Sequence, residues 1–220
     1  MVLTFFVVAN GNIIEVRRSK VPVAVNDLES PEWHEAQSVR IDRYWSGEPA
    51  PESRHAEARL LWSDKALHLR YVCNQAEPLV MTDNPQTEKK TMNLWDRDVC
   101  EIFIAPDARV VGWYFEFEVA PTGEWLDAAI DLTSGTRESD WNFNSHMTTA
   151  ARIEKDRVTT AMRIPWSLSI PKPQPGERWR VNLFRCVGGD PNRGYLSWQP
   201  TRTPEPLFHV PQVFGWLVFA

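Results

Sequence analysis

Apolar and polar residues alternate in short runs along much of this chain. In residues 55–62 the even-numbered positions are apolar and most odd-numbered positions are polar. After a turn at residues 63–65, the odd-numbered positions of residues 67–73 are the apolar ones. A repeat of two residues is typical of a strand, because successive side chains point to opposite faces. These runs predict an antiparallel hairpin with one face against a core and the other partly in solvent.

Further segments carry the same pattern or are rich in β-branched and aromatic residues, and turn signals separate them. No sustained helical period, internal repeat or low-complexity segment is present. Many short strands predict an all-β fold, an antiparallel, jelly-roll-like β-sandwich with long loops and little helix. We expect residues 1–220 to form one domain, since a sandwich of this length has one core. The further expected strands are residues 2–8 and 12–18 (a hairpin or two short strands), 113–119, 124–130, 146–153, 157–164, 178–187, 195–198 and 214–219.

Residues 93–107, NLWDRDVCEIFIAPD, combine these strand signals with candidate chemistry. Trp95 precedes a charged turn at residues 96–98, and a strand follows in which Glu101 and Phe103 share one face. Burying a carboxylate among apolar side chains is unfavourable unless the carboxylate has partners. Glu101 therefore either points to a solvated concave surface or is satisfied inside the protein. The sequence leaves both alternatives open.

Composition and charge argue against several classes of function. The net charge is −5 without a basic block, which argues against a nucleic-acid partner because phosphate binding needs a positive surface. The three cysteines, Cys73, Cys100 and Cys186, lack the spacing of a zinc or redox motif and are expected to be buried thiols. No run reaches the roughly 18 apolar residues of a membrane-spanning helix. Residues 1–9 are apolar but lack the basic start of a signal peptide.

A tryptophan, an acidic turn and a valine-x-glutamate-aromatic strand occur in LWDRDVCEIFIAPD (residues 94–107), and a PxxFGxL motif closes the chain at residues 211–217. Together with PVAVNDLESPEW (22–33), ARLLWSDKALHLRYV (58–72) and YFEFEVAPTGEW (114–125), these motifs resemble carbohydrate-binding module family 9 and related domains. The resemblance implies a β-sandwich, often with bound calcium, that holds the end of a sugar chain between two aromatic rings. It also implies an extracellular or periplasmic protein linked to the catabolism of glycans such as xylan or cellulose.

The resemblance also assigns candidate site residues. It implies that Trp95 is one stacking ring, that Phe208 replaces the second stacking tryptophan, and that Glu101 accepts hydrogen bonds from sugar hydroxyls. Stacking on a pyranose contributes on the order of 2–3 kcal/mol gross per ring. Association entropy then leaves an affinity of about micromolar to millimolar. Where the family has arginine, glutamine and asparagine, this chain has Glu118, Phe184 and Glu205.

Most candidates also have a purely structural interpretation. Trp95 could fold onto the edge of the sandwich, and Phe184 could belong to the core. Glu101 and Glu118 could accept vicinal hydroxyls, since charge strengthens such hydrogen bonds, or could instead pair with an arginine across the sheet. The arginines considered for this pairing are Arg97, Arg180 and Arg185.

Calcium binding is the further property that the resemblance raises. Calcium prefers several oxygen ligands, and the oxygen-bearing side chains nearest the motif are Asp83, Asn84, Asp96 and Asp98. Their spacing matches no calcium-loop motif, so capping of turns is the competing interpretation. Because the candidate site carries carboxylates, we expect a neutral or weakly polar glycan rather than an acidic one.

Three rival functions stay open. Glu101, Glu116 and Glu118 could supply the carboxylate pair of a glycoside hydrolase, although no other catalytic motif accompanies them. The sugar site could have been lost or retuned, which would leave an interaction module. A haem-binding sandwich would need axial ligands from a set such as Met92, Met147, His68 and His146.

Overall fold

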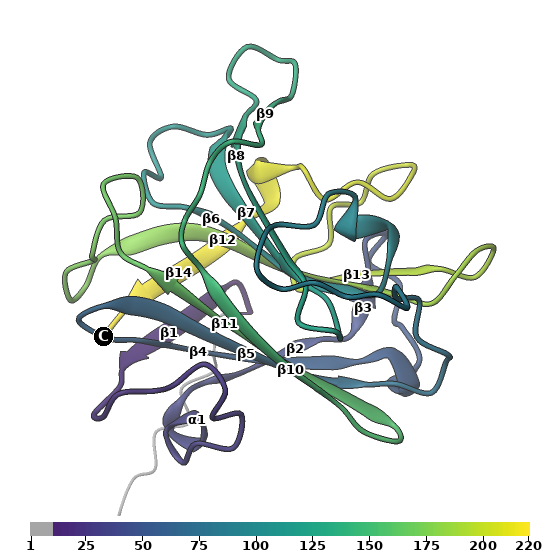
Figure 1. Ribbon diagram of the computed structural model, residues 1–220. Helices are drawn as coiled ribbons and strands as arrows, with labels where there is room; N and C mark the ends of the chain where they lie inside the picture. Colours follow the sequence, from purple (N-terminus) through teal and green to yellow (C-terminus); the bar gives the residue numbers. More distant parts are fainter. Residues whose placement is uncertain (1–10) are drawn as a thin grey trace, which may run out of the picture.

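The computed structural model describes residues 11–220, so the expected strand at residues 2–8 lies outside the described residues. The described chain forms a β-sandwich in which two curled sheets face each other across a hydrophobic core (Figure 1). The predicted all-β class is therefore confirmed. The helices of the described chain are short. They are α1 (Glu32–Glu35) and the 3-10 helices η1 (Glu52–Arg54), η2 (Leu94–Asp96) and η3 (Pro211–Val213).

The first sheet contains the strand predicted within residues 93–107. Its strands lie in the order β1, β14, β12, β6, β7, β8 and β9, and β13 pairs with β12 and with β3. The neighbouring pairs from β14 to β9 are antiparallel. The bounds are β1 (Ile13–Arg18), β3 (Arg43–Tyr44), β6 (Val99–Ala105), β7 (Trp113–Val119), β8 (Trp125–Asp131), β9 (Glu138–Asp140), β12 (Arg178–Val187), β13 (Gly194–Ser197) and β14 (Gly215–Phe219).

The second sheet contains the hairpin predicted from residues 55–73. Its strands lie in the order β10, β11, β5, β4 and β1, and β2 pairs with β4. Strand β1 joins both sheets, because its first residues pair in parallel with β14 and its last two pair in parallel with β4. The remaining bounds are β2 (Ser38–Ile41), β4 (Ala56–Trp62), β5 (Ala66–Asn74), β10 (Thr148–Ile153) and β11 (Arg157–Pro165).

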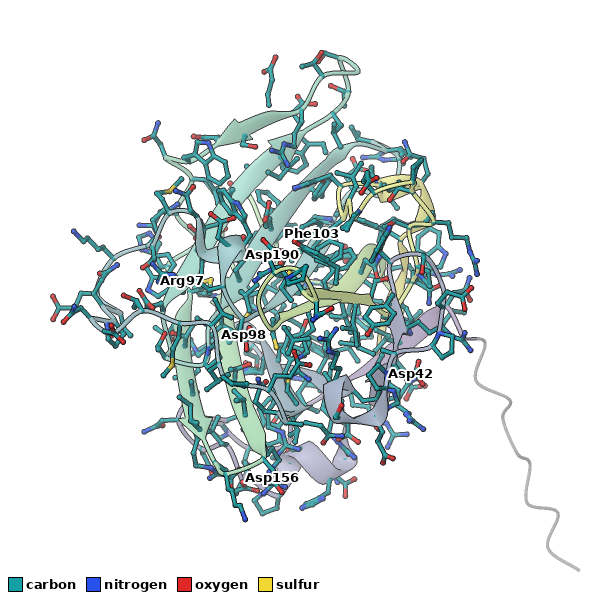
Figure 2. All side chains as sticks on the ribbon, turned by 90° about the vertical axis from the view of Figure 1, so that its right-hand side faces the viewer. Asp42, Arg97, Asp98, Phe103, Asp156 and Asp190 are labelled. Carbon is teal, nitrogen blue, oxygen red and sulfur yellow. The ribbon has the colours of Figure 1, made fainter. Side chains whose placement is uncertain are left out.

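The main core fills the space between the two sheets. Figure 2 shows the side chains of the described residues on the ribbon, seen from the right-hand side of Figure 1. In β6 the side chains of Ile102 and Ile104 enter this core, and Phe115 and Phe117 enter it from β7. Each such aliphatic or aromatic side chain contributes about 1.5–3 kcal/mol on burial. Because side chains alternate along a strand, Glu101 and the other residues on its side of β6 point to the opposite face of the first sheet.

That opposite face of the first sheet is also covered, and this cover builds the candidate site. A second hydrophobic cluster lies on it, with Phe103, Tyr114 and Phe184 contributed by the strands. Leu94 from η2 and Phe208 from the C-terminal segment pack over these strand residues. Because both faces are covered, every residue of β6 is buried, including its glutamate.

The three cysteines are buried, as predicted. Cys73 on β5 and Cys100 on β6 project from opposite sheets, and their sulfur atoms lie 3.4 Å apart in the core. Among the described residues, no helix has the length and apolar character needed to cross a membrane.

Candidate functional site

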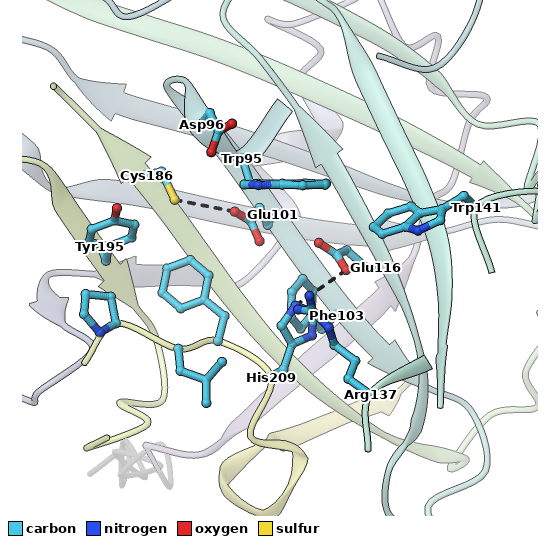
Figure 3. Close-up of a pocket in the computed structure, with 13 residues that line it drawn as sticks. Trp95, Asp96, Glu101, Phe103, Glu116, Arg137, Trp141, Cys186, Tyr195 and His209 are labelled. Carbon is cyan, nitrogen blue, oxygen red and sulfur yellow. Dashed lines mark hydrogen bonds and ion pairs between the residues drawn. The ribbon is translucent and has the colours of Figure 1, made fainter. Parts of the chain in front are cut away.

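A pocket of about 260 Å³ opens on the covered face of the first sheet (Figure 3). Strands β6, β7 and β12 form its floor with Glu101, Glu116 and Cys186. Helix η2 contributes Trp95 to the wall, and residues 206–209 form the opposite side. Segments distant in the sequence therefore meet here.

Trp95 lies at the pocket because its loop is anchored. Arg193, which follows β12, donates hydrogen bonds to the backbone carbonyls of Trp95, Asp96 and Arg97 at 2.7, 3.2 and 2.5 Å. The half-buried Trp95 ring packs on Trp141, with ring centroids 5.6 Å apart and planes inclined at 32°. Sequence reasoning found Trp95 but missed Arg193 and Trp141, which come from distant loops without a recognisable motif.

Phe208 and Phe184 form a stacked pair, with ring centroids 4.1 Å apart and planes at 13°. Phe208 lines the pocket and is 9 % exposed, whereas Phe184 is fully buried beneath it. Phe184 lies on the site face, because its neighbours Val181 and Leu183 enter the main core. Phe184 is thus buried, as the structural interpretation had it, and it supports Phe208 from beneath without lining the pocket.

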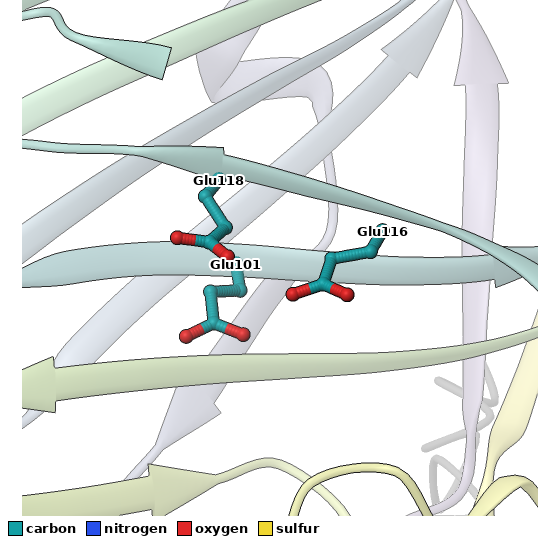
Figure 4. Close-up of side chains that lie close together, drawn as sticks. All are labelled: Glu101, Glu116 and Glu118. Atoms are coloured by element: carbon teal, nitrogen blue, oxygen red, sulfur yellow. The ribbon is translucent and has the colours of Figure 1, made fainter. Parts of the chain in front are cut away.

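Three glutamates meet below the aromatic rings, and we call Glu101, Glu116 and Glu118 the glutamate triad (Figure 4). Glu101 lies directly opposite Glu118 in the register of β6 and β7, and Glu116 shares their face. One carboxylate oxygen from each lies within 4.8 Å of the others, and the three side chains are at most 4 % exposed. The pairing of the strands therefore concentrates three acidic groups in one buried place.

The arginines considered as partners bind elsewhere. Within residues 11–220, no lysine or arginine nitrogen lies within 4.0 Å of a triad carboxylate. The alternative in which Glu101 or Glu118 pairs with one of these arginines is therefore wrong. The physical reason is that each arginine has other acceptors: Arg97 binds Glu124, Arg180 binds the carbonyl of Gln212, and Arg185 binds Gln75 and the carbonyls of Arg54 and His55.

The triad members differ in their remaining contacts. Glu101 accepts a weak hydrogen bond from the Cys186 thiol at 3.6 Å, and Glu116 lies 4.0 Å from Nε2 of His209. Both carboxylate oxygens of Glu118 are buried without a hydrogen-bond partner in the described part of the chain. Burial raises the pKa of all three carboxyls, and the neighbouring carboxylates raise the pKa of Glu101 and Glu118 further.

His209 is held as a neutral imidazole at the pocket. Burial lowers its pKa to about 3, with repulsion by Arg137 as a smaller cause. Its Nδ1 lies 2.7 Å from the hydroxyl of Tyr114, and its ring stacks on Phe103 with centroids 5.1 Å apart. Neither His209 nor Arg137 was identified from the sequence, because a single polar residue in a loop gives no signal there.

Other predicted residues lie outside the pocket floor. Glu205 is exposed and is not among the residues lining the pocket. Asp96 is exposed at the rim, whereas Asp98 is buried and used by the fold, accepting the N–H of Gly188 at 2.7 Å and the amide of Gln75 at 3.3 Å. The four residues considered for calcium, including the exposed Asp83 and Asn84, thus form no common site in the described chain.

The four residues considered as haem ligands lie in different environments and not around one pocket. Met92 and His146 are exposed, whereas Met147 belongs to the main core and His68 contacts Ser63. None of the four lines the pocket.

The carbohydrate family 9 binding domain-like family has a model that matches residues 28–220. The chain belongs to this family. The match covers both sheets from β2 onward and every residue that lines the pocket. It confirms the resemblance seen in the sequence motifs.

Solved structures share the fold of this family 9-like chain. A candidate carbohydrate-binding protein from Bacteroides uniformis aligns with a TM-score of 0.74 and 16% identity, covering 95% of this chain and 99% of that one. A family 9 module from Caldicellulosiruptor kristjanssonii in complex with cellotriose aligns with a TM-score of 0.67 and 16% identity, covering 94% and 93%. Its complex with glucose gives a TM-score of 0.65.

A curated relative in Arthroderma benhamiae is described as an extracellular protein. It is 25% identical over 178 residues, which cover 73% of this chain and 77% of the relative.

Proposed function

We propose that this chain is a non-catalytic glycan-binding domain and that the pocket takes the end of a neutral oligosaccharide of the xylan or cellulose type. One observation carries the proposal: Trp95, Glu101 and Phe208, three distant positions that the family resemblance marks, line one pocket. The family module from Caldicellulosiruptor kristjanssonii, which has this fold, was solved with glucose and with cellotriose.

The size of the pocket supports binding to a chain end. A volume of about 260 Å³ lies below the roughly 300–1,000 Å³ of sites that enclose drug-sized ligands. It therefore suits one or two sugar rings rather than a long stretch of polysaccharide. Trp95 offers the larger free aromatic surface, because it is half-buried, whereas Phe208 is only 9 % exposed and has one face against Phe184.

The acidic floor supports the preference for a neutral sugar. A sugar hydroxyl can both donate and accept, so it can bind Glu101 or Glu116 whether or not the carboxyl carries a proton. An acidic sugar would bring a further negative charge next to the triad. We therefore expect uronic acids to be rejected.

The proposal is tested by a glycan array followed by calorimetry on wild type, Trp95→Ala and the matched control Trp216→Ala. Trp216 lies on β14 and does not line the pocket. We expect millimolar or tighter binding of cello- or xylo-oligosaccharides, weakened about tenfold or more by Trp95→Ala and unchanged by Trp216→Ala. A glycan affinity that is unchanged in Trp95→Ala would contradict the proposed site, and the absence of any glycan binding would favour the interaction module.

Hydrolysis assays on wild type and Glu101→Gln decide the hydrolase alternative. The triad carboxylates lie side by side on one sheet face, whereas glycosidases place their pair on both sides of the scissile bond. We expect no hydrolysis of these oligosaccharides. Turnover that disappears in Glu101→Gln would overturn the binding function.

A further inference from the structure

We propose that the glutamate triad binds a divalent metal ion that prefers carboxylate ligands, with Ca²⁺ and Mn²⁺ as the candidates. The ion would lie at the floor of the pocket. This place is distinct from the loop residues Asp83, Asn84, Asp96 and Asp98, which are the calcium candidates nearest the sequence motif. The inference concerns the same pocket as the proposed function, but it rests on the triad alone.

The spacing of the oxygens is the first support. One oxygen each of Glu101, Glu116 and Glu118 lies within 4.8 Å of the other two. Oxygens bound to Ca²⁺ lie about 2.3–2.6 Å from the ion, so two on opposite sides are about 5 Å apart and two adjacent ones are closer. All three carboxylates can therefore reach one ion by side-chain rotations, without movement of the strands that carry them.

The second support is the buried carboxylate of Glu118. Its side chain is 0 % exposed, and neither of its oxygens has a hydrogen-bond partner among the described residues. Figure 4 shows this carboxylate turned toward those of Glu101 and Glu116. A buried anion without a partner is strongly unfavourable, so the group points to a cation that is supplied from outside the chain.

The described chain provides no direct basic partner for the triad. None of its lysine or arginine nitrogens lies within 4.0 Å of these carboxylates, and the Arg137 guanidinium that lines the pocket also lies beyond this distance. A divalent ion can neutralise two ionised carboxylates, whereas the ammonium group of an amino sugar can neutralise one. This difference favours a metal ion over an ammonium group.

The pocket gives the ion a way in and room for further ligands. Glu101 and Glu116 line the pocket directly, while Glu118 lies behind them. Ca²⁺ takes 6–8 oxygen ligands, so three carboxylates leave positions for water or for a sugar hydroxyl. Nε2 of His209, 4.0 Å from Glu116, offers a nitrogen that Mn²⁺ accepts more readily than Ca²⁺ does.

The test is calorimetry and thermal unfolding of the full chain, freed of metal with a chelator, with CaCl₂ or MnCl₂ as the probe and no sugar present. We expect one ion per chain and a rise in Tm of about 5–10 °C at hundredfold excess over Kd. Glu118→Gln removes a proposed ligand and should weaken binding at least 10- to 100-fold, which is the loss that substitution of an outer-shell partner alone causes. Glu88→Gln, at an exposed loop position, is the matched control and should leave binding unchanged.

Each alternative result overturns the inference. Absence of binding up to 10 mM of either ion, or binding that survives both Glu118→Gln and Glu116→Gln, places no metal at the triad. Triad-dependent binding of glucosamine in a protein that takes up neither metal assigns the site to an amine. Sugar titrations in chelator separate the two proposals, because loss of metal binding alone leaves the proposed glycan function standing.

Discussion

Glu101 on β6 lies directly opposite Glu118 on β7, and the two carboxylates share one buried patch with Glu116. Like charges opposite each other on a sheet are destabilising, and burial increases the effect. The sandwich therefore carries an unfavourable acidic group under an aromatic pocket. This relationship connects the stability of the protein to the chemistry of its candidate site.

Replacing Glu118 with glutamine should stabilise the metal-free protein at neutral pH. The carboxyl has a pKa raised well above its usual value by burial and by its two neighbours. Between the unfolded and folded pKa the native state binds more protons, so its stability falls as pH rises through that window. We expect Glu118→Gln to gain about 1–3 kcal/mol, with a larger gain at pH 8 than at pH 5.

Urea denaturation at both pH values measures this gain, with Glu88→Gln as an exposed control. A Glu118→Gln protein that is less stable than wild type at pH 8 would show that the buried carboxylate is not under repulsion.

His68 should make the stability of the folded protein fall as pH decreases, which is the opposite of the pH dependence expected from Glu118. Burial lowers its pKa to about 4, with repulsion by Arg163 as the second cause. The unfolded chain titrates near the usual value of about 6.5 and binds the proton more readily. This contribution is therefore complete above about pH 6.5 and is lost as pH falls toward 4, amounting to about 3 kcal/mol at most.

Denaturation of wild type, His68→Gln and the exposed control His146→Gln between pH 4 and 7 measures this contribution. We expect a shallower loss of stability toward acid in His68→Gln alone. Equal slopes in all three proteins would contradict the assignment to His68.

Substitutions of Phe208 and Phe184 should affect different properties although the two rings are stacked: Phe208 should matter mainly for glycan binding and Phe184 for stability. Phe184 is fully buried beneath Phe208, so Phe184→Ala should cost about 3–5 kcal/mol of unfolding free energy. Phe208 lines the pocket, so Phe208→Ala should lower glycan affinity about tenfold while costing less stability. Thermal unfolding and calorimetry on both variants check this, and the reverse ranking in stability would refute it.

Arg193 should influence binding through the position of Trp95. Its guanidinium donates to the carbonyls of Trp95, Asp96 and Arg97, so Arg193→Ala frees this segment. We expect a loss of glycan affinity of about 3- to 10-fold, because the segment must then be ordered on binding. Hydrogen exchange should become faster at residues 93–98. Unchanged exchange together with weaker binding would indicate direct contact with the sugar instead.

The sequence by itself determined the sandwich and the orientation of its strand residues. The alternation in β6 and β7 placed Glu101, Glu116 and Glu118 on the face away from Ile102 and Phe117, and the structure agrees. This could be predicted because a strand has a period of two residues, so each side chain's face follows from its local position. The motif around Trp95 also indicated the family, because a motif, like the period of a strand, is a local pattern in the sequence.

Only the tertiary structure decided which groups meet in the pocket. The register of β6 against β7 placed Glu118 opposite Glu101, and loop packing brought Trp141 to Trp95 and His209 to Glu116. Register and loop contacts depend on pairings between residues far apart in the chain, which a local pattern does not encode. For the same reason the sequence could not show that the candidate arginines bind other acceptors and leave the triad without a basic partner in the described structure.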